Sequence, residues 1–423
     1  MGNVGVMGLG KLGLIMALVL DKHGKHDVTG YDPTDRPRDI LTGKTSLPEK
    51  DFGLLLESNT VHLASSPSEV VRSSDVIFVV VATPHPPEYD GTVPSPEDPQ
   101  DFEYGYLVQA VRDLAQAAWD QHKDITVVIV STVLPGTISR VIWPLQNDQV
   151  TVVYSPSLIA LGTVEEDLLN PDFVILGADE REDVYPVAEI YASLHERPLQ
   201  IMSIESAELT KIAYNTFTSM KIVFANMLLE TAEKTGADCD SVTGALAMSS
   251  GNLLSSRYLT GGMGGGGYCH PRDTVAMSYL ARRLDLSTDL SGYLKQARED
   301  QSGWLADTVE KWSKLCPELA VIIMGTAYKP GSPLTGGSAA LLLRDQLKSR
   351  GIDVIPHDPY VNPGPHMASS ERVAQTEAVF VIGCAHPEFR ALKFAPSSVV
   401  IDPTGTISDR PGVTVVRLGR KNR

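Results

Sequence analysis

The sequence predicts an α/β protein in which two doubly wound parallel-sheet domains are joined by a long central helix and a helical middle domain. Apolar runs of strand length recur in the first and last thirds of the chain, as expected for parallel strands covered on both faces. Between them, residues 206–234 carry apolar side chains at helical spacing, with no glycine or proline. We expect domains at 1–203, 204–312 and 313–423.

The N-terminal segment carries the pattern of a dinucleotide-binding turn. A short apolar strand, residues 3–7, precedes Gly8, Gly10 and Gly13 in GxGxxG spacing, and an apolar helical run follows. The first glycine permits a tight turn, the second lets the backbone approach a pyrophosphate, and the third lets helix and strand pack closely. This segment predicts a Rossmann-like domain whose turn, with Lys11 and Leu12, binds the cofactor.

The end of the next strand indicates which cofactor binds. Asp32 closes the run HDVTGYD, 19 residues after Gly13. A carboxylate there accepts from the ribose 2′-hydroxyl and repels a 2′-phosphate, so the sequence favours NAD over NADP. Arg36 and Arg38 follow closely and keep the NADP alternative open.

Further strands are expected at 75–84, 125–133, 150–156 and 172–179. Thr83 and Thr132 stand at the carboxyl ends of two of them, where α/β sheets bind ligands, although each is also an ordinary residue for a strand end. The segment 84–103 is rich in proline and acidic residues and is too long for a plain connection, which indicates a lid or a mobile loop.

The segment 261–273, GGMGGGGYCHPRD, places one cysteine behind a run of glycines. Pro271 favours a helix start, so we expect Cys269 at a helix N-terminus, where the dipole stabilises a thiolate. The alternative is a flexible linker beside an inert cysteine. Glycine loops expose backbone N–H groups that suit a phosphate-bearing ligand, and we take the candidates from this loop to be Gly265, Gly266 and Gly267.

Composition narrows the class of protein. The 423 residues are 43% hydrophobic and carry 36 Lys and Arg against 52 Asp and Glu, for a net charge of −16, which argues against nucleic-acid and anionic-membrane surfaces. Four cysteines without a CxxC pair suit neither a metal site nor a disulfide framework. No apolar run reaches the length of about 18 residues that a membrane-spanning helix needs. We expect a soluble cytoplasmic protein without a metal.

Taken in order, these pieces resemble the UDP-glucose/GDP-mannose dehydrogenase family over essentially the whole chain. The matching segments are GLGKLG with Asp32, STVLPGT (131–137), AELTKIAYNTFTSMKIVFAN (207–226), GGGGYCHPRD (264–273), MGTAYKP (324–330) and HDPYV (357–361). The resemblance implies a homodimer that oxidises the C6 primary alcohol of a nucleotide sugar, such as UDP-glucose, to the acid with NAD.

The resemblance also assigns roles to residues. It implies that Cys269 attacks the aldehyde formed first, and that the resulting thiohemiacetal is oxidised to a thioester. Lys211 and Asn215, four residues apart on one helix face, would stabilise the oxyanions. Asp273 would hold water or act as a base, unless it only stabilises the helix start. Thr132 would position that water or the nicotinamide, and the remaining substrate contacts would be Lys329 and Tyr258.

The chain departs from the family where two glutamates are usual, because those positions are Ser157 and Leu161. A serine of ordinary acidity cannot replace a carboxylate as a general base at neutral pH. Three acidic residues lie just downstream, Glu165, Glu166 and Asp167. They either take over the role of the missing glutamates or form the solvated acidic start of a helix. Three alternatives follow: full oxidation with a rearranged base, a divergent member that takes an unusual sugar nucleotide or stops at the aldehyde, and a non-catalytic binding protein.

Overall fold

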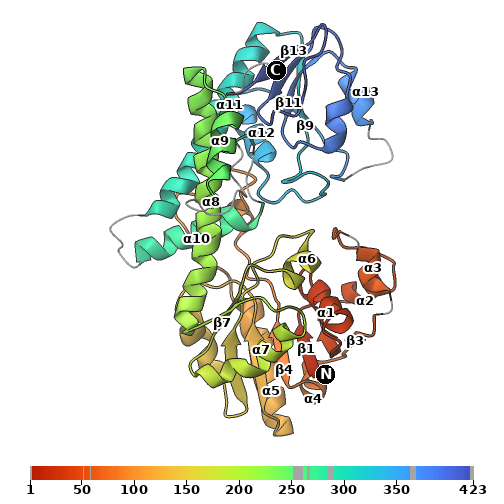
Figure 1. The fold of residues 1–423 in the computed structure, drawn as a ribbon, viewed down its shortest axis with the longest axis vertical. Helices are drawn as coiled ribbons and strands as arrows, with labels where there is room; N and C mark the ends of the chain where they lie inside the picture. Colours follow the sequence, from red (N-terminus) through yellow and green to blue (C-terminus); the bar gives the residue numbers. More distant parts are fainter. Residues whose placement is uncertain are drawn as a thin grey trace. The chain divides into compact units, whose positions relative to one another are not determined.

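The computed structural model describes residues 2–50, 52–57, 59–250, 261–263, 267–283, 289–362 and 368–419 (Figure 1). These residues form two compact units. Unit 1 comprises 1–84 and 102–213, and unit 2 comprises 85–101 and 214–423. In the described part of the chain, no helix is long and apolar enough to cross a membrane.

Unit 1 is built on one sheet with strand order β3-β2-β1-β4-β5-β6-β7-β8. Its strands are β1 (Asn3–Met7), β2 (Asp27–Tyr31), β3 (His62–Leu63), β4 (Val76–Val79), β5 (Ile125–Ile129), β6 (Val150–Tyr154), β7 (Val174–Gly177) and β8 (Leu199–Met202). In the central register, Val4 pairs with Val28 on one side and with Val76 on the other. The order 3-2-1-4-5-6 is that of a dinucleotide-binding fold, as predicted.

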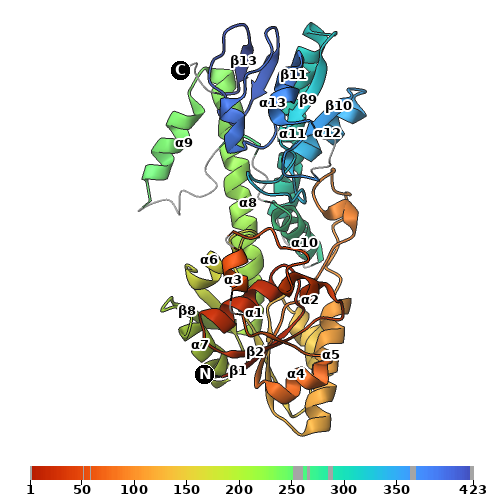
Figure 2. The ribbon, with the colours of Figure 1, turned by 90° about the vertical axis from the view of Figure 1, so that its right-hand side faces the viewer.

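Helices cover both faces of this sheet, on opposite sides of β1 and β2 in Figure 2. One face carries α1 (Gly13–Lys22), α2 (Arg36–Leu41), α3 (Phe52–Leu56), α6 (Val164–Leu169) and α7 (Tyr185–Ala192). The other carries α4 (Pro67–Ser73), α5 (Gly105–Gln121) and the first turns of α8 (Ile204–Thr235). Two apolar cores result, one on each face of the sheet.

One detail of this sheet differs from the prediction. The run 172–179 was expected to run parallel to its neighbours, but β7 pairs antiparallel with β6 and parallel with β8. The physical reason lies in the connection, because an antiparallel neighbour begins at the sheet edge where the previous strand ended, so no crossover is needed. The chain from β6 to β7 therefore stays at the carboxyl edge of β6, with α6 packed against α1.

Unit 2 has a parallel sheet of order β10-β9-β11-β12-β13, formed by β9 (Ala320–Met324), β10 (Val354–His357), β11 (Ala378–Ile382), β12 (Val399–Asp402) and β13 (Thr414–Arg417). In chain order this is the doubly wound arrangement 2-1-3-4-5. The strand β9 ends at Met324, and the rest of the segment MGTAYKP (324–330) is a loop.

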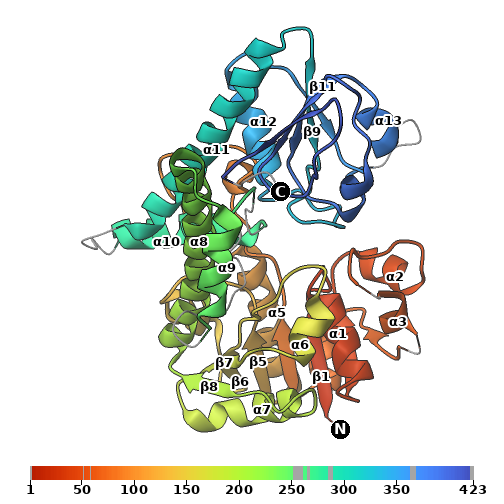
Figure 3. The same ribbon diagram turned by 45° about the horizontal axis from the view of Figure 1, so that its top comes forward.

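Helices also cover both faces of this second sheet. Figure 3 shows α11 (Leu290–Leu315) and α12 (Ala339–Ser349) on one side and α13 (Ser370–Ala374) on the other. The remaining helices are α9 (Cys239–Met248), α10 (Cys269–Arg283) and the second part of α8. The helix α8 agrees closely with the helix predicted over 206–234.

Candidate active site

The glycine turn of unit 1 has the geometry that its spacing predicts. Gly8 has φ +91°, and a Cβ there would lie 2.7 Å from the Val80 carbonyl oxygen. A Cβ on Gly13 would lie 1.9 Å from the Gly8 carbonyl oxygen, whereas a Cβ on Gly10 would meet nothing within 4 Å. The turn therefore needs Gly8 and Gly13 for its own packing, and Gly10 leaves open space where a ligand can approach the backbone before α1 begins.

Asp32 lies directly after β2 and is tied to this turn. Its Oδ2 accepts from the Leu9 N–H at 2.9 Å, and its Oδ1 accepts from the Thr34 N–H at 3.0 Å and from the Thr34 hydroxyl at 2.7 Å. A carboxylate offers about four lone-pair positions, so Asp32 retains capacity for a ribose hydroxyl. The residue thus joins the glycine turn to the ribose position expected of it.

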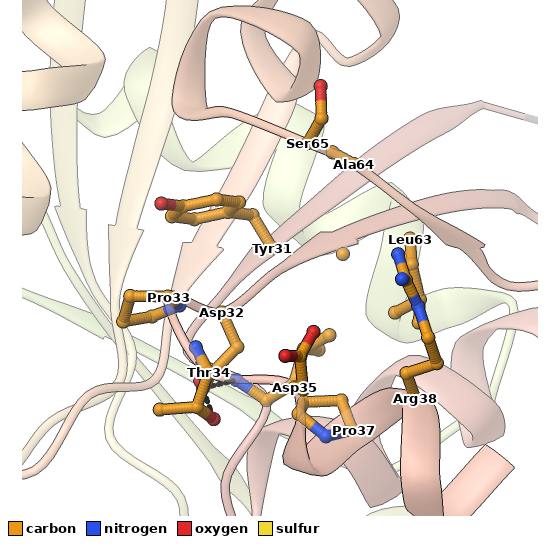
Figure 4. A pocket seen from close by; sticks show the side chains of 12 residues that line it. Tyr31, Asp32, Pro33, Thr34, Asp35, Pro37, Arg38, Leu63, Ala64 and Ser65 are labelled. Atoms are coloured by element: carbon orange, nitrogen blue, oxygen red, sulfur yellow. Dashed lines mark hydrogen bonds between the residues drawn. The ribbon is translucent and has the colours of Figure 1, made fainter.

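A pocket opens at this end of β2 (Figure 4). Asp32 and Thr34 lie on one side of it, with Asp35 and Arg38 from the start of α2 beside them and Ser65 opposite. The position and polar lining of the pocket suit the adenosine end of NAD. Arg38, one of the two arginines that keep NADP open as an alternative cofactor in the sequence, lies on the pocket wall. In the described residues, no group of His, Cys, Asp and Glu suits a metal ion.

The carboxyl ends of β4 and β5 are fastened to each other. Thr83 is buried, and its hydroxyl donates to the Thr132 carbonyl oxygen at 2.8 Å. The Ser131 hydroxyl donates to the Val81 carbonyl oxygen at 2.6 Å. The side chain of Thr83 therefore contacts the backbone of Thr132, the other threonine singled out in the sequence. This hydrogen bond fixes the loop that carries Thr132 against the end of the neighbouring strand.

The first half of α8 holds two loops of unit 1. Lys211, only 7% exposed, donates to the Ser157 carbonyl oxygen at 2.9 Å, so it grips the loop after β6. Glu208 is fully buried and accepts from the Gly136 N–H at 2.6 Å and from the Ile138 N–H at 2.8 Å, in the loop after β5. Burial raises the pKa of Glu208 to about 7, although these backbone N–H groups oppose the rise. Sequence reasoning gave Glu208 no role, although it lies in the segment 207–226 that carries part of the family resemblance.

The part of α8 that belongs to unit 2 contributes Asn215. Its side-chain amide donates to Asp273 Oδ2, and Arg272 Nε donates to Asp273 Oδ1 at 2.9 Å. Asp273 is fully buried, and each of its carboxylate oxygens has a donor, Oδ2 from α8 and Oδ1 from α10. The structure brings Asn215 and Asp273 together and adds Arg272, whose pKa is raised by the neighbouring Asp273 and Cys269 although burial opposes the rise.

Cys269 is the first residue of α10 and is partly exposed. The helix starts two residues before Pro271, which had been expected to mark its first position. Proline is accommodated in this first turn because the N–H groups there have no intrahelical partner. The expectation that this cysteine lies at a helix N-terminus is confirmed. Gly267 lies just before it, whereas Tyr258, Gly265 and Gly266 lie outside the described residues.

Lys329 lies in the loop after β9, 5.6 Å above the Tyr328 ring. Asp358 fixes this loop, because its Oδ2 accepts from the Thr326 N–H at 2.6 Å and from the Ala327 N–H at 2.8 Å. His386 lies 3.1 Å from the same oxygen. These hydrogen bonds lower the pKa of Asp358 to about 2 although burial opposes the change, so the carboxylate stays ionised.

The positions of the two missing glutamates have different surroundings. The Ser157 hydroxyl is buried without a hydrogen-bond partner among the described residues. Leu161 packs against the apolar core of unit 1. Downstream, Asp167 accepts from the Ala160 N–H at 2.8 Å, and Glu165 lies 2.9 Å from His23. These two acids stabilise α6 and its contacts, which agrees with the helix-start interpretation.

Three family models match successive parts of the chain. Residues 2–195 match the NAD-binding domain of the UDP-glucose/GDP-mannose dehydrogenase family, residues 205–299 its central domain, and residues 322–409 its UDP-binding domain.

Relatives of known name match most of the chain. GDP-mannose 6-dehydrogenase from Azotobacter vinelandii is 26% identical over 442 residues, which cover 96% of this chain and 98% of the relative. UDP-glucose 6-dehydrogenase from Haloferax volcanii is 27% identical, with 84% and 83% covered. The solved structure of a UDP-glucose dehydrogenase from Pyrobaculum islandicum agrees in fold, with a TM-score of 0.83, 23% identity and 99% and 98% coverage. The chain therefore belongs to the UDP-glucose/GDP-mannose dehydrogenase family and is an NAD-dependent nucleotide-sugar dehydrogenase.

Proposed function

We propose that this enzyme oxidises the C6 primary alcohol of a nucleotide sugar, UDP-glucose or a similar compound, to the uronic acid by way of a thioester on Cys269. The observation that carries the proposal is the position of Cys269 at the start of α10, one helical turn before the buried Asp273 that Asn215 and Arg272 hold. A helix N-terminus favours the thiolate, which is the nucleophilic form.

The reaction balances in four steps. The glycine turn with Asp32 would hold NAD, which would supply the hydride acceptor for both oxidations. The alcohol first loses a hydride and a proton to give the aldehyde. The Cys269 sulfur then adds to the aldehyde carbon to give a thiohemiacetal. Loss of a second hydride and a proton gives the thioester, and water then cleaves the C–S bond to give the acid and the free thiol.

The remaining residues serve this chemistry through charge and position. Lys211 and Asn215 would stabilise the oxygen that carries negative charge in each intermediate. Thr132 would position the attacking water or the nicotinamide, and Asp273 would orient water. Substrate contacts would come from Lys329, from the backbone N–H groups of Gly265–Gly267, and from Tyr258.

One observation favours a second candidate endpoint, release of the aldehyde. Lys211 grips the backbone oxygen of Ser157, at a position where the resemblance implies a glutamate, and the neighbouring Leu161 is apolar. Without a carboxylate there, hydrolysis of the thioester must rely on another base. This candidate predicts an aldehyde product in place of the acid.

A test of the thioester route is intact-protein mass spectrometry during turnover with UDP-glucose, GDP-mannose and related nucleotide sugars. The proposal predicts a covalent adduct on Cys269 that hydroxylamine removes, and loss of both adduct and acid in Cys269→Ala. Acid formation at the wild-type rate in Cys269→Ala would overturn the covalent route.

We also propose a homodimer formed through α8. Leu209, Phe217 and Phe224 lie seven or eight residues apart on this helix, so they share one face, and their side chains are exposed by 43%, 40% and 43%. Large apolar residues exposed on one helix face are typical of a subunit interface. Light scattering should give the mass of two chains, and the mass of one chain would contradict the proposal.

A further inference from the structure

The segment 85–101, here called the strap, is the acidic, proline-rich run that leaves unit 1 after Pro84 and is part of unit 2. Its short 3-10 turn, Pro87–Tyr89, packs against α10. Lys295 on α11 donates to the carbonyl oxygens of Ser95 and Pro96 at 3.1 Å each, and Glu299 accepts from the Ser95 N–H at 3.0 Å. The strap is therefore fastened along α11.

Arg298 joins the strap to a second segment, the turn before α12. Arg298 Nη2 on α11 donates to the Gly91 carbonyl oxygen of the strap at 2.9 Å and to the Gly337 carbonyl oxygen before α12 at 3.2 Å. In the described part of the chain, no carboxylate forms an ion pair with Arg298, and its Nε has no hydrogen-bond partner. Burial lowers the pKa of Arg298 to about 10, so the guanidinium remains charged at neutral pH.

The two glycines bonded by Arg298 both pack closely against the segment that carries Cys269. Gly337 has φ +74°, and a Cβ there would lie 2.3 Å from the Gly267 carbonyl oxygen. Gly91 has φ +79°, and a Cβ there would lie 2.5 Å from the Pro271 ring. The two contacts flank Cys269, since one falls two residues before it and the other two residues after it.

We propose that Arg298 is a positioning residue for Cys269, because its one guanidinium holds Gly91 and Gly337 against the two sides of the segment 267–271. The inference rests on the proposed function for its consequence in catalysis, but its geometry does not depend on it. The guanidinium is charged and largely buried, and each hydrogen bond from such a donor is stronger than one between neutral groups. Arg298 acts through the two glycine turns and is not placed against the reacting atoms.

The four cysteines provide a test that needs neither sugar nor NAD. Cys269 is partly exposed, whereas Cys239 and Cys384 are buried and become reactive only when unit 2 opens. Iodoacetamide labelling with peptide mass mapping gives a separate rate for each. In Arg298→Gln we expect Cys269 to react about tenfold faster, the change that corresponds to losing one hydrogen bond from a charged donor. Cys239 and Cys384 should stay protected, and Arg298→Lys should restore most of the wild-type rate.

A pair of glycine variants tests the same inference without touching Arg298. Gly337→Ala places a methyl group against Gly267 and should also raise the Cys269 rate. Gly351→Ala is the matched control, because Gly351 has φ +77° but a Cβ there meets nothing within 4 Å. It suffers the same backbone strain and should keep the wild-type rate.

Two results would overturn the inference. One is an unchanged Cys269 rate in both Arg298→Gln and Gly337→Ala, and the other is a rise shared by Cys239 and Cys384, which would mean general loss of structure. The predicted labelling pattern in an enzyme that forms no acid would keep the positioning role and remove the thioester route instead.

Discussion

Glu208 gives a stability prediction whose magnitude follows from its burial. The pKa of this carboxyl rises from an ordinary value of 4.5 to about 7 in the native state. Between these values the native protein keeps a proton that the unfolded chain has lost, so the unfolding free energy falls as pH rises through this window. At about 1.4 kcal/mol for each pH unit, the loss amounts to about 3 kcal/mol and persists above pH 7.

Glu208→Gln removes the titration and retains an acceptor for one of the two backbone N–H groups. Urea unfolding at pH 5 and pH 8 measures the effect, and the contribution of unit 2 cancels in the difference between the two proteins. We expect the variant to gain most of about 3 kcal/mol relative to the wild type between these pH values. Glu189→Gln is the control, because Glu189 is an exposed carboxylate on α7 of the same unit and is not among the groups that shift the pKa of Glu208. A difference between Glu208→Gln and wild type that is independent of pH would refute the reasoning.

Two further predictions concern the cofactor and the cation. Asp32→Ala removes the carboxylate that is expected to accept from the ribose hydroxyl of NAD, and it also removes the acceptor of the Leu9 N–H. We expect the KM for NAD to rise about tenfold, the change that corresponds to one lost hydrogen bond to a charged group. An unchanged KM would mean that Asp32 does not contact the cofactor. Lys211→Ala should lower kcat about a hundredfold if its amine stabilises the oxyanions, and a normal kcat in steady-state assays would limit Lys211 to gripping Ser157.

The sequence was informative where a local rule fixes the structure. GxGxxG spacing predicted the turn at Gly8 and Gly13, because close backbone approach excludes side chains there. The helical periodicity of 206–234 predicted α8 to within two residues at each end. The glycine run with Pro271 placed Cys269 at a helix start, although the helix begins two residues earlier than Pro271 suggested.

Features set by long-range contacts were not accessible in this way. Strand β7 is apolar whichever way it runs, so its residues do not encode its direction. Glu208 and Arg298 look like ordinary charges on helices until the chain folds. Each bonds to backbone groups far away in sequence, Glu208 to residues about 70 positions distant and Arg298 to Gly91, 207 positions away. Backbone partners carry no side-chain signal that a sequence pattern can display.

The measurement that tests the central claim most directly is the amount of NADH formed for each nucleotide sugar consumed, together with the mass of the product. Two NADH per sugar, with a product that carries one additional oxygen in place of two hydrogens, is the result we expect for oxidation through a Cys269 thioester. One NADH per sugar with an aldehyde product would contradict it.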